Sequence, residues 1–372
     1  MKHQIILIGK DVWTPYHGIK EFEPDHIHLL FTKETYHVAD PIFALLPESI
    51  KSTSYCVEAY EAKSVIEVCH TIHKQFAGEF TYNLSVGTKV MAFAAYTAAQ
   101  AYGAIPFYLS EQGEVIYLNT FERHPMVSRL NNLEMLTLSG NVITSYFDSN
   151  RLQEEDVQAA WLIKEFIEKY PKEHERIQNF YNTNANRRLE QLPKNHIFPN
   201  TLSFHQDGQS LLIQLNELVL LQIFTPFANM LYFEGRWWET LVANKVQIWS
   251  NEQQTLPEVW QSVVFHSQRS PELAKSEIDI LVNNHQKLIV IECKSGKVNQ
   301  NDVYKVDAVR EIYGGDISQA ILASYYPVPA NLREKCKTLQ IALFAPRYYA
   351  DRIYHIDTLP EWIDKLSRRL QI

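Results

Sequence analysis

The chain has 372 residues, more than one hydrophobic core usually supports, so we expect two domains. Its composition, 46% apolar and 21% charged, is typical of globular proteins and excludes an intrinsically disordered one. The net charge of −8 excludes a uniformly basic surface for nucleic acid, so any contact with a polyanion requires a local patch or a bound metal.

The sequence contains no uninterrupted apolar run of about 18 residues, and its first residues lack the pattern of a secretory signal. We therefore predict a cytoplasmic protein with no membrane partner. The cysteines are far apart and fit no zinc-binding spacing.

The N-terminal part of the chain alternates between strand and helix patterns. Short apolar stretches predict strands at residues 4–8, 28–31, 53–57, 80–84, 105–109 and 115–118. Apolar residues at helical spacing predict helices over residues 61–76 and 89–102. This rhythm predicts an α/β fold, with a Rossmann-like N-terminal domain and a mainly parallel sheet.

The pattern changes after residue 145. Residues 146–195 are charged and largely helical in pattern, and we interpret them as a helical connector between domains of residues 1–145 and 196–372. In the second domain, residues 201–223 alternate like strands and residues 234–246 carry a helical apolar stripe. Two apolar strands at 278–282 and 288–291 then flank a polar turn, which predicts a β-hairpin.

Charged residues interrupt or end the two strands of this hairpin. Asp279 lies inside the first strand, and Glu292 and Lys294 end the second. Because side chains alternate across a strand, Glu292 and Lys294 share one face, and hairpin pairing can bring Asp279 beside them. Such carboxylates can hold Mg²⁺ or Mn²⁺ for phosphodiester hydrolysis, with the lysine orienting a water. Alternatively, both carboxylates lie at strand ends facing solvent, with Lys294 as a salt-bridge partner.

The spacing of these residues resembles a known signature. Asp279, a gap of twelve residues and then Glu292-Cys293-Lys294 after an apolar strand are similar to the PD-(D/E)XK motif of restriction-endonuclease-like nucleases. One departure is that Ile278, and not a proline, precedes the aspartate. The resemblance covers roughly the last 170 residues and implies a restriction-endonuclease-like α/β domain over 196–372.

The same resemblance implies roles for individual residues. The family usually adds a glutamate from the preceding helix, for which Glu239 is suitably placed and Glu234 is the competitor. The resemblance therefore implies catalytic residues Glu239, Asp279, Glu292 and Lys294. It further implies a metal held by Asp279, Glu292 and the backbone carbonyl of Cys293.

Two polar loops follow strands of the N-terminal domain. Gly87, Thr88 and Lys89 precede a predicted helix, whose N-terminal N–H groups favour phosphate. The segment is neither a Walker A loop nor a dinucleotide fingerprint, and a simple helix cap is an equal alternative. The loop Gly9-Lys10-Asp11 after the first strand could meet it, because ligands of open α/β sheets bind beyond the carboxyl ends of strands.

A Rossmann-like domain with Asn83-Leu84-Ser85-x-Gly87-Thr88-Lys89 before a helix, joined to a PD-(D/E)XK domain, resembles the CRISPR-associated Rossmann-fold (CARF) nucleases of type III CRISPR defence. The resemblance implies a homodimer that binds a cyclic oligoadenylate, commonly cyclic tetra-adenylate, and then cleaves DNA or RNA. By analogy, the pocket would be lined by Gly9, Lys10, Asp11, Ser85, Gly87, Thr88 and Lys89.

Two other functions stay open at this point. One is a ligand-responsive nucleic-acid-binding regulator whose acidic cluster is structural. The other is a stand-alone restriction or repair nuclease. The sequence leaves open whether DNA or RNA is cut, in single or double strands, and which ring size activates cleavage.

Overall fold

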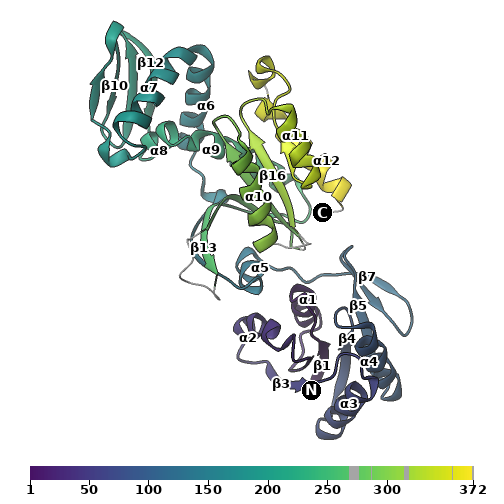
Figure 1. Ribbon diagram of the computed structural model, residues 1–372. Coiled ribbons are helices and arrows are strands. Elements are labelled where there is room, and N and C mark those ends of the chain that lie inside the picture. The colour runs from purple at the N-terminus through teal and green to yellow at the C-terminus, as the bar shows by residue number, and fades with distance from the viewer. Residues whose placement is uncertain (268–275, 286, 314–317, 354, 371–372) are drawn as a thin grey trace. The chain divides into compact units, whose positions relative to one another are not determined.

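A computed structural model describes residues 1–267, 276–285, 287–313, 318–353 and 355–370 (Figure 1). The chain forms two compact units, one built mainly from residues 1–143 and one mainly from residues 144–265 and 276–370. Within these described ranges, no helix is both long and apolar enough to cross a membrane.

The N-terminal unit contains a seven-stranded sheet in the order β3-β2-β1-β4-β5-β6-β7. Neighbouring strands from β3 to β5 are parallel, and the last two are antiparallel, which confirms the predicted mainly parallel α/β fold. The strands are β1 (Lys2–Leu7), β2 (His26–Phe31), β3 (Lys51–Cys56), β4 (Glu79–Asn83), β5 (Ile105–Leu109), β6 (Glu114–Tyr117) and β7 (Arg123–Pro125). The helices are α1 (Trp13–Phe22), α2 (Asp40–Leu45), α3 (Ala62–Gln75), α4 (Lys89–Ala101) and α5 (Asn132–Leu138).

The core of this unit lies between the sheet and the helices α3 and α4. Ile5, Leu7 and Tyr82 from the sheet pack with apolar residues of both helices. The chain leaves β1 toward β2 and leaves β4 toward β5, so the order of strands reverses between β1 and β4. The loops after these two strands therefore lie at the topological switch point, where open α/β sheets bind ligands.

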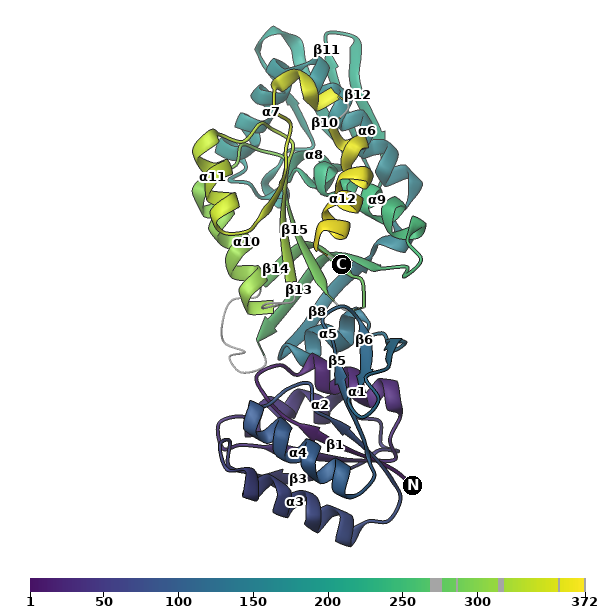
Figure 2. The same ribbon diagram turned by 90° about the vertical axis from the view of Figure 1, so that its right-hand side faces the viewer.

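The C-terminal unit contains a six-stranded sheet in the order β17-β16-β15-β14-β13-β8. The helices α10 and α11 cover one face of it, and α9 and α12 cover the other (Figure 2). The strands are β8 (Asn141–Asp148), β13 (Glu258–Ser267), β14 (Ser276–Asn283), β15 (Leu288–Lys294), β16 (Ser318–Ser324) and β17 (Ala342–Phe344). The helices are α9 (Arg236–Glu252), α10 (Gln300–Tyr313), α11 (Ala330–Thr338) and α12 (Leu359–Leu370).

The segment expected to be a connector packs into the C-terminal unit. Its helices are α6 (Glu154–Lys169) and α7 (Pro171–Asn184), and Ala160 and Ile163 of α6 share one core with Trp238 of α9. The apolar positions of α6 recur at helical spacing, and burying that stripe fixes the helix against α9. Contacts divide the chain after Ile143, close to the predicted boundary, whereas no such division falls near residue 195. The functions of the domains stay a prediction.

A second, smaller sheet extends the same unit. Its order is β12-β11-β10-β9, all antiparallel, with α8 (Ala228–Phe233) leading into α9. The strands are β9 (Asn195–Ile197), β10 (Leu202–Gln206), β11 (Ser210–Leu215) and β12 (Leu218–Phe224). The last three agree with the predicted strand pattern at 201–223.

Candidate active site

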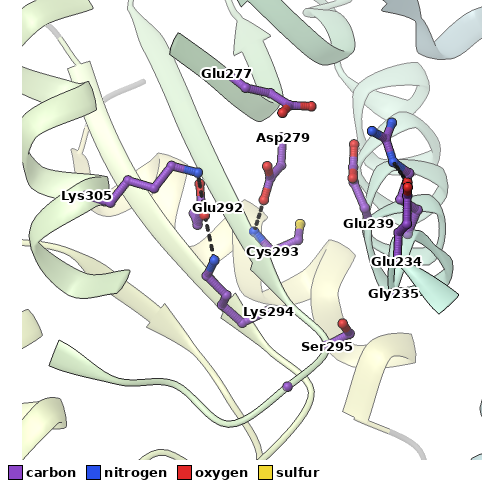
Figure 3. A pocket seen from close by; sticks show the side chains of 12 residues that line it. Glu234, Gly235, Glu239, Glu277, Asp279, Glu292, Cys293, Lys294, Ser295 and Lys305 are labelled. Carbon is purple, nitrogen blue, oxygen red and sulfur yellow. Dashed lines mark hydrogen bonds and ion pairs between the residues drawn. The ribbon is translucent and has the colours of Figure 1, made fainter. Parts of the chain in front are cut away.

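A cavity of about 300 Å³ in the C-terminal unit gathers charged side chains from α9, β14, β15 and α10 (Figure 3). Every residue for which the sequence predicts a catalytic or metal-binding role in this domain lies in its lining. The lining consists of Glu234, Gly235, Arg236, Glu239, Glu277, Asp279, Glu292, Cys293, Lys294, Ser295, Gly296 and Lys305.

The hairpin formed by β14 and β15 places Asp279 next to Glu292. The two strands pair antiparallel, with Ile280 opposite Ile291. Continuing this register by one residue places Asp279 opposite Glu292. The backbone N–H of Cys293 donates a hydrogen bond of 2.7 Å to Asp279 Oδ2. This bond fixes the direction of the Asp279 carboxylate at the end of the hairpin.

Two lysines hold Glu292, whose side chain is only 5% exposed. Lys294 Nζ lies 2.9 Å from Glu292 Oε1 and 3.2 Å from Asp302 Oδ1. Lys305, from α10, donates to both Glu292 oxygens, at 2.8 and 3.0 Å. Burial alone would lower the pKa of each lysine, but the neighbouring carboxylates outweigh it and raise the pKa of both. Both lysines are therefore charged at neutral pH.

The first turn of α9 supplies Glu239. Gly235 caps this helix with a φ of 78°, and a Cβ built there would clash with the Ser295 side chain, so the position favours glycine. Glu239 Oε1 accepts a hydrogen bond of 2.9 Å from the hydroxyl of Ser262. Glu234, the competing carboxylate, instead forms an ion pair of 3.2 Å with Arg236. This difference favours Glu239 for the predicted role.

Ser262 is a residue of the site that the sequence does not reveal. It lies on β13 opposite Asp279, because residues on both sides of this pair are joined in the ladder. Its φ of 46° is left-handed, which costs roughly 1–2 kcal/mol for a residue with a side chain. Strain of this kind persists where the surroundings enforce it, and here the Ser262 hydroxyl contacts both Glu239 and Arg236.

The carboxylates of the cavity are crowded. Burial, together with the charges of Glu277 and Glu292, raises the pKa of Glu239 to about 7, although Ser262 and Arg236 oppose the shift. Burial and the charges of Glu292 and Glu239 raise the pKa of Asp279 well above its usual range. Carboxylate oxygens that repel one another in this way fit a divalent cation, because Mg²⁺ and Mn²⁺ prefer oxygen ligands and would relieve the repulsion.

The raised pKa of Glu239 predicts how stability depends on pH without divalent metal. The folded protein binds this proton more tightly than the unfolded chain, so between about pH 4.5 and pH 7 the folded state holds more protons. The contribution of Glu239 to the free energy of unfolding is therefore fully present below about pH 4.5. It is lost as the pH rises from there through about 7. Urea unfolding in EDTA at several pH values should show this fall in the wild type and a shallower one in Glu239→Gln. Equal slopes in both proteins would contradict the expectation.

In the N-terminal unit, the two predicted loops touch. A Cβ built on Gly9 would lie 2.9 Å from the backbone nitrogen of Gly87, so these loops meet at the switch point. Gly87 has a φ of 93°, which glycine adopts without strain. Lys10 and Lys89 are exposed beside these glycines in the chain. The meeting of the loops agrees with the geometry that the sequence predicts, and ligand binding by them stays a prediction.

Three of the predicted pocket residues make local hydrogen bonds. Thr88 caps α4, its hydroxyl accepting from the N–H of Met91 and donating to the Ala59 carbonyl. Ser85 donates to Asn83 and accepts from the N–H of Leu109, and Asp11 accepts from the N–H of Trp13 and the hydroxyl of Thr14. These bonds shape the rim, and they support the alternative in which Thr88 acts as a helix cap.

Residues 228–362 match the family model described as the Card1-like endonuclease domain. The C-terminal unit therefore carries a Card1-like endonuclease domain. The matched residues include the whole cavity lining, from Glu234 to Lys305. The Card1-like match places the acidic cavity inside an endonuclease domain, which the geometry alone does not show.

The chain is also similar in structure to solved proteins along almost its whole length. Can2 from Sulfobacillus thermosulfidooxidans, solved in complex with cyclic tetra-adenylate, has a TM-score of 0.72 at 18% identity, over 98% of this chain and 99% of that one. Protein VC1899 from Vibrio cholerae has a TM-score of 0.76 at 16% identity, over 99% and 97%. A type III CRISPR defence DNA nuclease activated by cyclic oligoadenylate has a TM-score of 0.58 at 13% identity, over 93% and 49%.

At these identities the similarities establish the fold, which joins a Card1-like domain to a Rossmann-like unit in one chain. They confirm the predicted α/β fold of both units. No curated protein sequence matches the chain significantly.

Proposed function

We propose that the chain is a metal-dependent endonuclease of type III CRISPR antiviral defence, activated by a cyclic oligoadenylate and cleaving DNA and/or RNA. The observation that carries the proposal is that the Card1-like match coincides with the acidic cavity containing Glu239, Asp279, Glu292 and Lys294. Can2 and the type III CRISPR nuclease, which share the fold, bind or are activated by such ligands. These findings favour a nuclease over a ligand-responsive regulator.

Residues of the cavity fit a divalent metal. Asp279 and Glu292 offer carboxylate oxygens from adjacent strands, the Cys293 carbonyl is a further candidate, and Glu239 approaches from α9. A bound Mg²⁺ or Mn²⁺ supplies Lewis acidity and lowers the pKa of a coordinated water. We assign Asp279 and Glu292 to holding this ion, as in the sequence prediction.

The lysines would act on charge and position. Lys294 lies beside Glu292 and would orient the attacking water. Lys305 neutralises Glu292 through two hydrogen bonds, and because its side chain is 46% exposed it could also contact the scissile phosphate. Ser262 holds Glu239 toward the cavity and is a positioning residue in this scheme.

The N-terminal unit would act as the sensor. The meeting loops after β1 and β4 present glycine backbone and two exposed lysines at the switch point, where the helix α4 also begins. Backbone N–H groups at a helix N-terminus favour phosphate. A homodimer could place two such loops around a symmetric cyclic ligand, which would activate cleavage only through a higher affinity for the active arrangement.

Replacing Lys89 tests the sensor site. A lost charge-assisted contact is worth about 1.5–3 kcal/mol, so Lys89→Ala should raise the concentration of cyclic tetra-adenylate for half-maximal activation at least about tenfold. Lys74→Ala is the matched control, because Lys74 is an exposed lysine at the other end of the unit, in the last turn of α3. Equal activation curves for the wild type and both variants would remove Lys89 from the site.

Cleavage assays test the whole proposal. Labelled single-stranded DNA, single-stranded RNA and supercoiled plasmid are incubated with Mn²⁺ or Mg²⁺, with and without cyclic tetra-adenylate and other ring sizes. Cutting that requires both metal and ligand supports it. Cutting with metal alone supports a stand-alone restriction or repair nuclease. No cutting under any condition, by protein shown to bind nucleic acid, would favour the regulator.

A further inference from the structure

Three buried histidines cluster on the sheet of the N-terminal unit. His3 on β1 pairs in register with His26 on β2, and His28 lies two residues further along β2, on the same face as His26. The three residues are at most 5% exposed. One ring nitrogen of each lies within 4.8 Å of the other two. The cluster is near the starts of β1 and β2, whereas the candidate sensor loops follow strand ends.

A buried nitrogen of the cluster lacks a hydrogen-bond partner among the described residues. His3 Nδ1 and His28 Nε2 are 3.0 Å apart, and His28 Nδ1 is 2.6 Å from the hydroxyl of Thr53. His26 Nε2 is buried and without a hydrogen-bond partner in the described part of the chain, whereas the backbone of Ala77 hydrogen-bonds to His3. Burying an unpaired polar group is unfavourable, so the His26 nitrogen calls for a ligand.

Aromatic packing does not account for three histidines. Phe76 and Phe80 pack against these rings, with the Phe80 ring stacked 4.6 Å from that of His3. Phenylalanine at position 26 would fill the same stack without burying an unpaired nitrogen. The imidazoles therefore add something that packing alone does not require, namely ring nitrogens that all lie within 4.8 Å of one another.

The donor set fits a transition metal. An unprotonated imidazole offers one nitrogen lone pair to a metal ion, and three such rings stand together here. Neutral imidazole suits Zn²⁺, Cu²⁺ and Ni²⁺, whereas Mg²⁺ prefers oxygen. Ligand atoms about 2.0–2.1 Å from a tetrahedral Zn²⁺ lie about 3.3 Å apart. This separation is close to the 3.0 Å between His3 Nδ1 and His28 Nε2. The hydroxyl of Thr53 fixes the His28 ring, as partners of metal-bound histidines do.

We propose that His3, His26 and His28 form a binding site for a Zn²⁺-class ion that ties β1 to β2. Rotation of the His26 side chain would bring its ring nitrogen to the ion as the third ligand. A fourth ligand would complete the tetrahedral coordination. The site is separate from the acidic cavity in residues and in ligand chemistry, and it does not depend on the proposed nuclease function.

Zinc binding by the full-length chain tests the proposal. Untagged protein carrying Asp279→Asn and Glu292→Gln, which disable the acidic cavity, is stripped with chelator and titrated with Zn²⁺ against a chromophoric chelator. We expect one bound equivalent, lost in His26→Phe, which keeps a ring in the stack and breaks no hydrogen bond that the structure describes. His124→Phe, at an exposed histidine of the same unit, should retain the equivalent.

Two further measurements keep the test independent of any one variant. Zn²⁺ should raise the Tm of the parent protein but not that of His26→Phe, because a ligand stabilises only the state that binds it. Co²⁺ in place of Zn²⁺ should give the intense visible absorption of a tetrahedral nitrogen site. No bound equivalent, the same equivalent in His26→Phe, or only the weak spectrum of hydrated Co²⁺ would overturn the proposal.

Discussion

Glu292→Gln is expected to reduce metal-dependent cleavage at least about a thousandfold. A metal contributes several kcal/mol of transition-state stabilisation, and each 1.36 kcal/mol is a factor of ten in rate. Glutamine keeps the size of the side chain but removes the charge that Lys294 and Lys305 hold at 2.9 and 2.8 Å. Initial rates on a labelled substrate at saturating activator, over a range of Mn²⁺ concentrations, measure the loss.

Two control variants separate chemistry from folding. Glu217→Gln changes an exposed carboxylate of the same unit and should cleave like the wild type. Glu234→Gln changes a cavity carboxylate that is paired with Arg236 and should lose far less activity than Glu239→Gln. Calorimetric Mn²⁺ binding should weaken in Glu292→Gln even without substrate. A Glu292→Gln protein that folds and cleaves within tenfold of the wild type would refute the assignment.

Trp238→Ala is expected to lower the free energy of unfolding of the C-terminal unit by about 3–5 kcal/mol, the usual cost of removing a large buried aromatic side chain. Trp238 is 1% exposed and packs near Trp237 and Tyr325. Its indole N–H donates a 3.0 Å hydrogen bond to the Ala323 carbonyl, which links α9 to β16. The substitution would leave a cavity and remove this hydrogen bond.

Urea unfolding followed by tryptophan fluorescence can measure this effect. Only Trp13 lies in the N-terminal unit, so the signal reports mainly the C-terminal one. Phe224→Ala, at an aromatic residue that is 67% exposed, is the matched control and should change stability by less than about 0.5 kcal/mol. Similar losses in both variants would mean that Trp238 does not anchor α9.

The sequence predicts the central part of the candidate site because its signals are local. Glu292 and Lys294 are two residues apart on one strand, and Asp279 lies across a hairpin whose turn is visible in the sequence. Glu277 can be inferred in the same way, since it precedes Asp279 by two residues on the same strand face, yet it is not among the predicted residues. Glu239 follows only from the resemblance to the PD-(D/E)XK family, which implies a glutamate from the preceding helix.

Other residues enter the site through contacts that no spacing encodes. Lys305 reaches Glu292 only because α10 crosses back over β15. Ser262 is an ordinary strand residue in the sequence, and its left-handed backbone depends on its neighbours. In the histidine cluster of the N-terminal unit, His3 and His26 are likewise brought together only by the parallel register of β1 and β2. The apolar stripe of α6 is readable in the sequence, but the core against which it packs is not.

The charges that line the acidic cavity also link metal binding to protons. Its five carboxylates face three cationic side chains, which would leave two negative charges if all were ionised. The raised pKa of Glu239 and of Asp279 means that protons neutralise part of this excess while the cavity holds no metal. Binding of the divalent ion that we propose would release these protons. The affinity of the cavity for the ion is therefore expected to rise as the pH rises.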